Sequence, residues 1–209
     1  MMRVPWIPLA AALAIAGCVR LNQPAPRVTD YTITYAAPAP ADDESPLPIV
    51  LQIPPFAVSA AFDTHGMMFR EGDHRVGRYA HARWAANPGH LVADMIARDF
   101  AESNQFRAAQ HARAPRARDF PPTGEVEAIE ERIRDSRCEA NLEIRVLLVG
   151  LRGAHRNPVA FRSGYTEREP CPCADADAYA GAVSRALARI STRMRADVVT
   201  AIANANSSP

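Results

Sequence analysis

The feature that most constrains the fold is a long apolar stripe near the C-terminus. Seven apolar residues recur there at intervals of three or four positions, which is the spacing of one face of an α-helix. They are Tyr179, Val183, Leu187, Ile190, Met194, Val198 and Ile202. Arg185 and Arg189 fall on the opposite side, and Asp175 or Asp177 is suited to cap the N-terminus. The pattern therefore predicts a long amphipathic helix that packs on a β-sheet.

Strands that could form such a sheet precede the helix. Residues 142–151 alternate between apolar and polar side chains, which predicts a strand. Its apolar face consists of Leu142, Ile144, Val146 and Leu148. Gly and Pro within residues 153–158 predict a turn, and residues 159–166 are expected to return antiparallel to the first strand.

Three further strand signals lie nearer the N-terminus. Residues 31–35 alternate strictly and predict a first strand, whereas residues 49–53 are continuously more apolar and predict a buried one. The apolar face of the first consists of Tyr31, Ile33 and Tyr35. Residues 67–70 and 76–79 flank a segment that contains Gly72, which predicts a hairpin with glycine in the turn.

A second helix is expected after Asn87 and Pro88, because these residues are favoured at the N-cap and first helical positions. Its apolar arc consists of Leu91, Val92, Met95, Ile96 and Phe100. Residues 36–48 and 107–124 lack periodicity and predict loops. The arginines of the second loop could contact lipid headgroups or a partner, although a solvated loop is the plainer interpretation.

The segment 126–138 is ambiguous. Val126, Ile129 and Ile133 have helical spacing, but Ile129 and Ile133 would also share one face of a strand. Both alternatives stay open. The whole pattern predicts one α+β domain, with a mainly antiparallel sheet and two packed helices.

Composition supports a single folded domain and argues against nucleic acid as the partner. The chain has 209 residues, of which 48% are hydrophobic and 22% charged, so it can bury one core. The formal net charge is +1, and it falls to about zero once Arg3 is removed with a signal peptide. After the N-terminal segment, no stretch is long and apolar enough to suggest a spanning helix.

The N-terminus has the marks of a secretory signal. Arg3 precedes an apolar run over residues 4–16, followed by Gly17 and Cys18. The stretch Leu13-Ala14-Ile15-Ala16-Gly17-Cys18 resembles a bacterial lipobox, in which the cysteine receives diacylglycerol and becomes the first residue of the mature protein. Cleavage after Ala16 at an ordinary A-x-A site is the alternative. The lipobox interpretation predicts a domain anchored in a membrane and facing the periplasm.

The remaining cysteines suggest one disulfide. The expected compartment permits oxidation, and three cysteines allow one intramolecular bridge. Cys138 lies just before the strand at 142–151, and Cys171 and Cys173 follow its antiparallel partner, so all three return to one end of the hairpin. We therefore expect Cys138 to pair with Cys171 or Cys173, with Cys171 preferred because it is nearer the strand end.

We find no sequence pattern for catalysis, cofactor binding or metal binding. The sequence contains no G-x-S-x-G, H-E-x-x-H or glycine-rich phosphate loop. Cys171-Pro172-Cys173 alone is a weak metal signal, and the scattered histidines are expected at the surface. The acidic run of Glu125, Glu127, Glu130 and Glu131 is expected to form a solvated face rather than an acid/base pair.

A combination of these marks is similar to one known family. The marks are Cys18 in its lipobox, the strand at residues 31–33, Tyr79 followed by Arg83-Trp84-Ala85, Pro88 before the first helix, the strand at 142–151 and the closing helix. Together they resemble the ABC-type transport auxiliary lipoprotein family. Two features depart from the pattern: Gly77-Arg78 stands before Tyr79, and Cys171 and Cys173 form a C-x-C pair.

The resemblance implies work beside an ABC transporter and an MCE-type periplasmic lipid carrier, moving phospholipid between the inner and outer membranes. It implies no enzymatic activity. The expected organisation is a signal peptide (1–17), a lipidated cysteine and tether (18–30), the auxiliary domain (31–204) and a disordered tail (205–209). Val19 after the cysteine predicts the outer membrane. A structural envelope lipoprotein that does not handle lipid is the alternative function.

Three residues are candidates for partner contacts: Tyr79, Arg83 and Trp84. For Trp84 and Arg83 a structural role is also possible. Trp84 could pack against the helix that it precedes, and Arg83 could pair with a carboxylate, as is usual for such residues.

Overall fold

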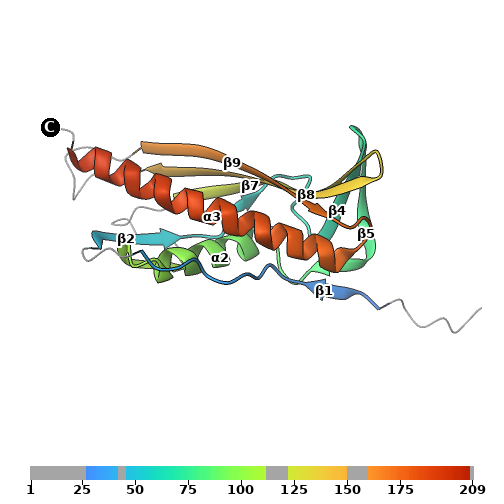
Figure 1. The fold of residues 1–209 in the computed structure, drawn as a ribbon, viewed down its shortest axis with the longest axis horizontal. Coiled ribbons are helices and arrows are strands. Elements are labelled where there is room, and N and C mark those ends of the chain that lie inside the picture. Colours follow the sequence, from blue (N-terminus) through green and yellow to red (C-terminus); the bar gives the residue numbers. More distant parts are fainter. Residues whose placement is uncertain (1–26, 42–45, 112–121, 150–159, 208–209) are drawn as a thin grey trace, which may run out of the picture.

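A computed structural model describes residues 27–41, 46–111, 122–149 and 160–207 (Figure 1). Within them lie two helices, α2 (Pro88–Glu102) and α3 (Ala176–Ser207), and two sheets. The strands of the larger sheet are β1 (Thr29–Tyr31), β3 (Ala57–Val58), β4 (Gly66–Glu71), β5 (Arg75–Trp84), β7 (Pro122–Arg134), β8 (Arg137–Val149) and β9 (Ala160–Cys171). The smaller sheet pairs β2 (Leu47–Ile53) with β6 (Phe106–His111). The α+β class is confirmed.

The larger sheet is mixed rather than purely antiparallel. Its order is β1-β5-β4-β7-β8-β9, with β3 pairing β7 beside this path. The long pairs, β7 with β8 and β8 with β9, are antiparallel, and so is the β4–β5 hairpin. The β1–β5, β4–β7 and β3–β7 pairs are parallel. The parallel pairs join segments far apart in sequence, which local patterning does not reveal.

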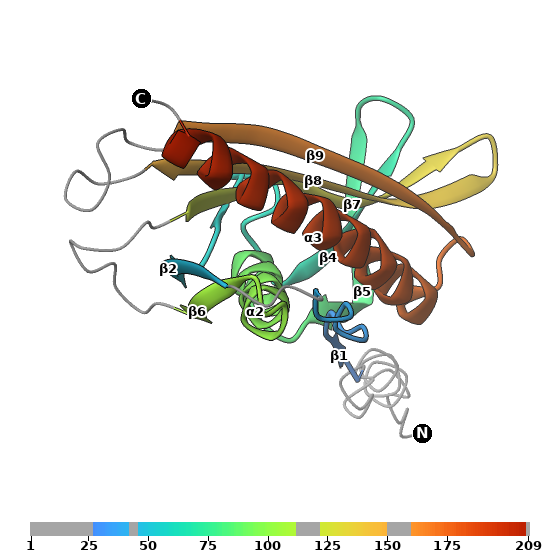
Figure 2. The same ribbon diagram turned by 60° about the vertical axis from the view of Figure 1, so that its left-hand side comes forward.

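Both helices lie on the same side of the larger sheet, and α2 is seen nearly end-on beside α3 in Figure 2. The apolar stripe of α3 faces the sheet, because Leu187 and Ile190 have no exposed surface. Asp175 caps this helix, accepting hydrogen bonds from the backbone amides of Asp177 and Ala178 at 3.0 Å each. The prediction of a long amphipathic helix on a sheet is therefore confirmed.

The shorter helix begins as its sequence predicts. The Asn87 side chain accepts a hydrogen bond from Gly89 N at 2.9 Å, and Pro88 occupies the first turn. Val92, Ile96 and Phe100 are buried against the core, while Leu91 and Met95 are partly exposed.

Residues 32–41, here called the strap, are not a strand as expected. Only Thr29–Tyr31 forms β1, which pairs in parallel with β5. The strap then runs from β1 along the length of the molecule (Figure 1), and Ile33 is 2% exposed. The alternation over residues 31–35 therefore reflects burial of one side of an extended chain. In the described part of the chain, the backbone of the strap is hydrogen-bonded to the helices and not to a strand.

The contacts of the strap explain this difference. Thr34 N donates to Ser184 Oγ of α3 at 3.1 Å, and Arg98 Nη1 of α2 donates to the Tyr35 carbonyl at 2.8 Å. Farther along, Ala41 N donates to the Ser103 carbonyl at the end of α2, at 3.0 Å. Helix groups thus satisfy the strap's backbone in place of a neighbouring strand.

Three other segments can be compared with their predicted structure. The predicted loop at 107–124 is wrong at both ends, because residues 107–111 belong to β6 and residues 122–124 to β7. The ambiguous segment 126–138 is strand, ending β7 and beginning β8 around a two-residue turn. The predicted turn at 153–158 lies outside the described residues, but the antiparallel return is confirmed as β9.

The hairpin predicted around Gly72 is present. Gly72 has φ of +64°, a conformation that glycine adopts without strain, and it lies between β4 and β5. The strand β5 continues to Trp84, farther than the sequence pattern suggested. This extension carries Tyr79, Arg83 and Trp84 on one strand.

Candidate functional site

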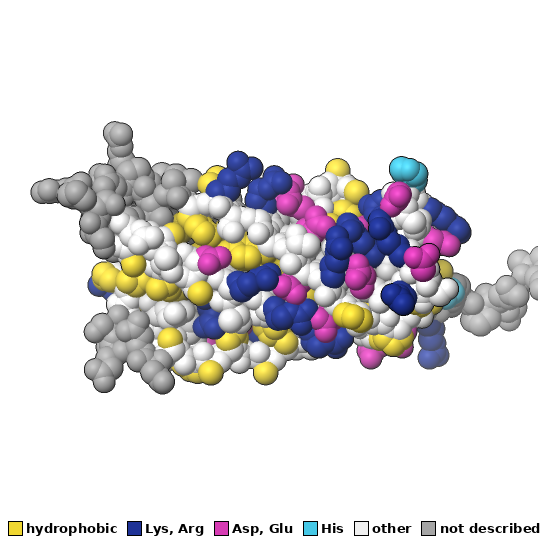
Figure 3. Space-filling view, turned by 45° about the horizontal axis from the view of Figure 1, so that its top comes forward, with side chains coloured by type: hydrophobic (Ala, Val, Ile, Leu, Met, Phe, Trp, Pro, Cys, Tyr) yellow, Lys and Arg dark blue, Asp and Glu magenta, His cyan; other side chains and the backbone are white. Residues whose placement is uncertain are grey.

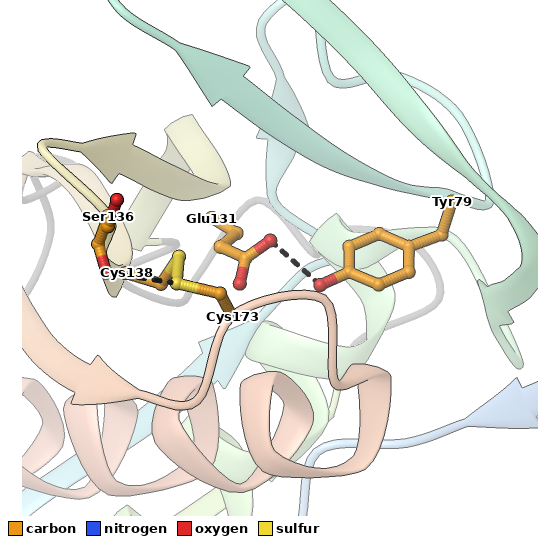
Figure 4. The surroundings of a disulfide bond; sticks show 5 residues. All are labelled: Tyr79, Glu131, Ser136, Cys138 and Cys173. Atoms are coloured by element: carbon orange, nitrogen blue, oxygen red, sulfur yellow. Dashed lines mark hydrogen bonds between the residues drawn. A yellow bond between two sulfur atoms is a disulfide. The ribbon is translucent and has the colours of Figure 1, made fainter.

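A disulfide between Cys138 and Cys173 closes one end of the sheet (Figure 4). It joins the start of β8 to the loop before α3, with the two Cα atoms 5.1 Å apart. Cys173 Sγ also lies 3.7 Å from the Ser136 carbonyl oxygen, a packing contact because an oxidised sulfur has no proton to donate. The expected pairing of Cys138 with a downstream cysteine is present, but the preference for Cys171 is wrong.

Register explains why Cys173 forms the bridge. Cys171 is the direct partner of Cys138 in the β8–β9 ladder, so its backbone is still held in the strand. Pro172 follows, and the chain turns away from β9, which brings Cys173 back over Cys138. The nearer cysteine in sequence is therefore left as a thiol.

That thiol, Cys171, is half-buried beside a buried carboxyl group. Burial raises the pKa of Cys171 to about 11, and the nearby Glu131 adds to the increase. The backbone amide of Ala140 and the guanidinium of Arg185 act in the opposite direction. At neutral pH the group is a protonated thiol with little nucleophilic character.

Glu131 is 1% exposed and lies between the disulfide and Tyr79 (Figure 4). Tyr79 Oη donates a hydrogen bond of 2.8 Å to Glu131 Oε2. Burial raises the pKa of Glu131, while the bond from Tyr79 and the backbone amide of Ala174 lower it by less. Burial and this carboxylate also raise the pKa of Tyr79 far above its ordinary value, so Tyr79 stays a donor.

The acidic run is therefore not the solvated face that the sequence predicts. Glu130, like Glu131, is 1% exposed, but it lies on the other face of β7. There it accepts hydrogen bonds from Arg70 Nε at 2.9 and 3.0 Å and from Arg132 Nε at 3.0 Å. Only Glu125 and Glu127 keep partly exposed side chains. Strand alternation sends the two adjacent glutamates to opposite faces.

Trp84 is fully buried and packs in the core. Its ring centroid lies 5.8 Å from that of Tyr179 in α3, and Tyr179 stacks on Tyr79 at 6.2 Å. The plainer interpretation of Trp84 therefore holds, except that the helix it contacts here is α3 rather than the one it precedes. Among the three partner candidates, Trp84 offers no surface to a partner, and Tyr79 is half-buried.

Arg83 is exposed and pairs with Asp30 of β1, with Nε to Oδ1 at 2.6 Å. Both side chains are about half exposed, so the pair contributes little stability. The pair does connect β5 to the segment that leads back toward Cys18. Arg83 is thus the one partner candidate of the three with a largely accessible side chain.

A shallow depression lies beside the disulfide. Its volume is about 560 Å³, and it is lined by the β7–β8 turn, by Cys138 and by residues 170–173. Asp135 and Ser136 in that turn have φ of +49° and +59°, as a two-residue hairpin of the primed type requires. Arg137 also lines the depression.

The described residues contain no group of three His, Cys, Asp or Glu side chains that could hold a metal ion. His65, His74, His81 and His90 are exposed, as expected for surface residues. Among the same residues, neither helix is long and apolar enough to cross a membrane. Cys18 and its lipobox lie outside the described part of the chain.

The outer face of the larger sheet is charged. Arg132 Nη2 and Asn141 Nδ2 both donate to Glu143 Oε1, at 3.4 and 3.0 Å, and Glu130 lies next to them. At the sheet edge, Arg185, Arg189 and Arg193 of α3 pair with Glu167 and Glu169 of β9. Positive and negative side chains are interspersed over the face in Figure 3.

Comparison with protein families gives one match. The model described as "ABC-type transport auxiliary lipoprotein component" matches residues 31–195. That range begins at the last residue of β1 and ends within α3, so it includes the strap, strands β2 to β9 and the disulfide. No curated protein matches the chain significantly.

Two solved structures have a similar fold. Protein XCC0632 from Xanthomonas campestris, described as DUF330, is 20% identical with a TM-score of 0.70, covering 84% of this chain and 98% of its own. A second, described only as an uncharacterized protein, is 12% identical with a TM-score of 0.56, covering 74% and 96%. At these identities the likeness concerns the fold alone.

Proposed function

The chain belongs to the ABC-type transport auxiliary lipoprotein family. From this premise we propose that it is the lipid-anchored periplasmic component of a system that moves phospholipid between the inner and outer membranes. The anchor is Cys18, and the membrane is the outer one. The proposed partners are an ABC transporter and an MCE-type periplasmic protein. The observation that carries the proposal is the family match over residues 31–195.

The way the N-terminal segment joins the domain supports an anchored role. The strap is bonded to both helices and Ile33 is buried, so the domain includes the chain from β1 onward. Ten residues lie between Cys18 and Thr29, so the chain makes eleven Cα–Cα steps there. Fully extended, they span at most about 40 Å, which keeps the domain close to the membrane that holds the lipid. The end that carries β1, Arg83 and the disulfide then faces that membrane or a partner near it.

The small cavity in the core supports a role in positioning partners rather than in carrying lipid inside the protein. The apolar cavity between the helices and the two sheets has a volume of about 10 Å³, with Leu51, Ile96 and Met194 among its lining residues. That is room for about one water molecule. An acyl chain does not fit in this cavity, so lipid passage is assigned to the partner. No catalytic role is proposed.

The test is crosslinking in intact cells followed by purification of the tagged full-length chain and identification of the crosslinked proteins. We expect an ABC permease and an MCE-domain protein to copurify with the wild type. Cys18→Ser should lose both, because the precursor is not anchored. Cys171→Ser serves as the matched control, since it also removes one thiol but leaves the lipobox intact. Recovery of neither protein with the wild type would reject the proposal.

The structural alternative predicts a different result. An envelope lipoprotein that does not handle lipid transport would copurify with envelope assembly or cell-wall proteins. Its deletion would leave the phospholipid composition of the two separated membranes unchanged. We expect instead that deletion shifts the distribution of phospholipid between them.

A further inference from the structure

The described cysteines stand at one place in the fold, although only two are bridged. Cys138 and Cys173 form the disulfide, and Cys171 is the direct ladder partner of Cys138. Directly opposed residues of antiparallel strands have Cα atoms about 4.5–5.5 Å apart, within the range that a disulfide spans. Cys138 therefore has two possible partners at bridging distance, and one of them is a thiol.

A buried carboxylate accompanies this arrangement. Glu131 lies next to the disulfide and interacts with the Cys171 thiol. Its Oε2 accepts the bond from Tyr79, whereas Oε1 is buried without a hydrogen bond of good geometry to a described residue. The charge of this carboxylate is not needed for an ion pair in the described part of the chain.

We propose that Cys138, Cys171 and Cys173 form an internal thiol–disulfide exchange site, in which the bridge moves between Cys138–Cys173 and Cys138–Cys171 and the neighbouring Glu131 carboxylate restrains the exchange. The inference is independent of the proposed transport function. It assigns a chemical role to Cys171 and Glu131, which the anchored role does not use.

The exchange balances without an external oxidant or reductant. Cys171 loses its proton to hydroxide from the solvent, and the thiolate attacks Cys138 Sγ. The Cys138–Cys173 bond breaks, and Cys173 leaves as a thiolate that takes a proton from water, because Cys173 is exposed. The products are a Cys138–Cys171 bridge and an exposed Cys173 thiol.

The surroundings of Cys171 determine how this exchange depends on pH. Glu131 of β7 and Asp175 before α3 raise the pKa of Cys171, and Arg185 of α3 and the Ala140 amide of β8 lower it. Two tyrosines, Tyr79 of β5 and Tyr179 of α3, also face the thiol and stay protonated. Only the thiolate attacks, so the exchange should be slow at neutral pH and accelerate as pH rises toward about 11.

Migration of the bridge would change what holds the loop before α3. In the described state Cys173 fastens that loop to β8, two residues ahead of the Asp175 cap. In the alternative state the bridge lies within the β8–β9 ladder, and the loop is fixed only by its packing. The exposed Cys173 thiol then becomes available beside the depression at the β7–β8 turn.

The test uses the oxidised mature protein, held without reductant at pH 7 and at pH 9.5. Samples are unfolded in acid, free thiols are alkylated with N-ethylmaleimide at pH 5, and tandem mass spectrometry locates the label. At first only Cys171 should be labelled, and label at Cys173 should then appear, faster by about tenfold per pH unit. If Cys171 remains the sole labelled cysteine at both pH values, the bridge does not migrate.

Three variants separate the exchange from general stability. Cys173→Ser should form a Cys138–Cys171 bridge on oxidation, and two free thiols in this variant would overturn the proposal. Glu131→Gln should accelerate the exchange, because the Glu131 carboxylate raises the pKa of Cys171 and only the thiolate attacks. Glu127→Gln makes the same change on the same strand, where the side chain pairs with Arg145, and should exchange at the wild-type rate. Equal rates in both glutamate variants would contradict the restraint by Glu131.

Discussion

At the scale of single residues, the informative pair is Glu130 and Glu131. Adjacent in sequence and equally buried, they occupy opposite faces of β7 and have different partners. Glu130 is neutralised by two arginines, whereas Glu131 faces a tyrosine and the sulfur atoms. The sequence could not distinguish them, because the segment that contains them fits both a helix and a strand. Only the choice of strand places one glutamate inward and the other outward.

Replacing Glu131 with Gln should stabilise the protein at neutral pH and have little effect in acid. Burial raises the pKa of Glu131 above its ordinary value of 4.5, so the folded state binds this proton more tightly than the unfolded state. Its contribution to stability is therefore lost as pH rises from about 4.5 through the folded pKa. Gln keeps an acceptor for Tyr79 without the charge.

The measurement is the melting temperature of wild type and Glu131→Gln at pH 4 and pH 7. We expect the variant's advantage to grow between the two values. An equal difference in melting temperature at both pH values would show that the charge of Glu131 does not destabilise the folded protein.

Loss of the disulfide should cost about 3–4 kcal/mol of unfolding free energy, since it closes a loop of sequence separation 35. The comparison is made in a Cys171→Ser background, so that no alternative bridge can form. Adding Cys173→Ser to that background should lower stability by this amount in denaturant titrations. Cys171→Ser alone should stay within about 1 kcal/mol of wild type. A double variant as stable as the single one would mean that the bridge does not constrain the unfolded chain.

At the scale of elements, the sequence predicted those helices and strands whose patterns lie within a few neighbouring residues. The caps and stripes of α2 and α3, the Gly72 hairpin and the alternation of β8 are each readable from a few neighbouring residues. The strand β6 was missed because its partner is β2, far away in sequence, and its Arg- and Ala-rich residues lack alternation. The strap was mistaken for a strand for the converse reason: it alternates, but its backbone bonds to groups of the two helices and not to a described neighbouring strand.

The face of α3 is tested by one buried and one exposed substitution. Leu187 has no exposed surface, so Leu187→Ala should cost about 2–5 kcal/mol. Arg189 is exposed and pairs with Glu167 and Glu169, so Arg189→Ala should cost about 1 kcal/mol or less. Denaturant titration measures both. Equal losses would contradict the packing of this stripe on the sheet.

The strap should behave as part of the core rather than as tether. Ile33→Ala should destabilise the protein by about 2–5 kcal/mol, because the side chain is 2% exposed. The matched control is Thr32→Ala, its exposed neighbour, which should change stability by no more than about 0.5 kcal/mol. Limited proteolysis provides a second readout: cleavage within residues 32–41 should become faster in Ile33→Ala only.

At the scale of the whole molecule, the helices and sheets form one domain whose ends differ. β1 and the start of α3 lie at one end of the long axis, and α3 finishes toward the other (Figure 1). The α+β class and the single domain were predictable, because the spacing of apolar residues shows which helices and strands have a face to bury against one another. The candidate site was only partly predictable: the cysteines could be placed at one end of a hairpin, but Tyr79 and Glu131, 52 residues apart, meet through the β5-β4-β7 order.

Sorting of the mature protein should depend on the residue after Cys18. Val19 favours transfer to the outer membrane in lipoproteins that this chain resembles, and Asp at that position favours retention at the inner membrane. Val19→Asp should therefore move the protein to inner-membrane fractions in a sucrose gradient. Val19→Ala, the control, should leave it in outer-membrane fractions. Wild-type protein found wholly in the inner membrane would contradict the proposed location.

The strap also determines how the domain would respond to mechanical load. A pull on the N-terminus along the long axis acts parallel to β1 and the strap, so their hydrogen bonds to β5, α2 and α3 are loaded in shear, all at once. A strand peeled sideways would instead break its bonds one at a time and at lower force. The geometry therefore suits an attachment that carries tension between a membrane and a large assembly without unravelling from its anchored end.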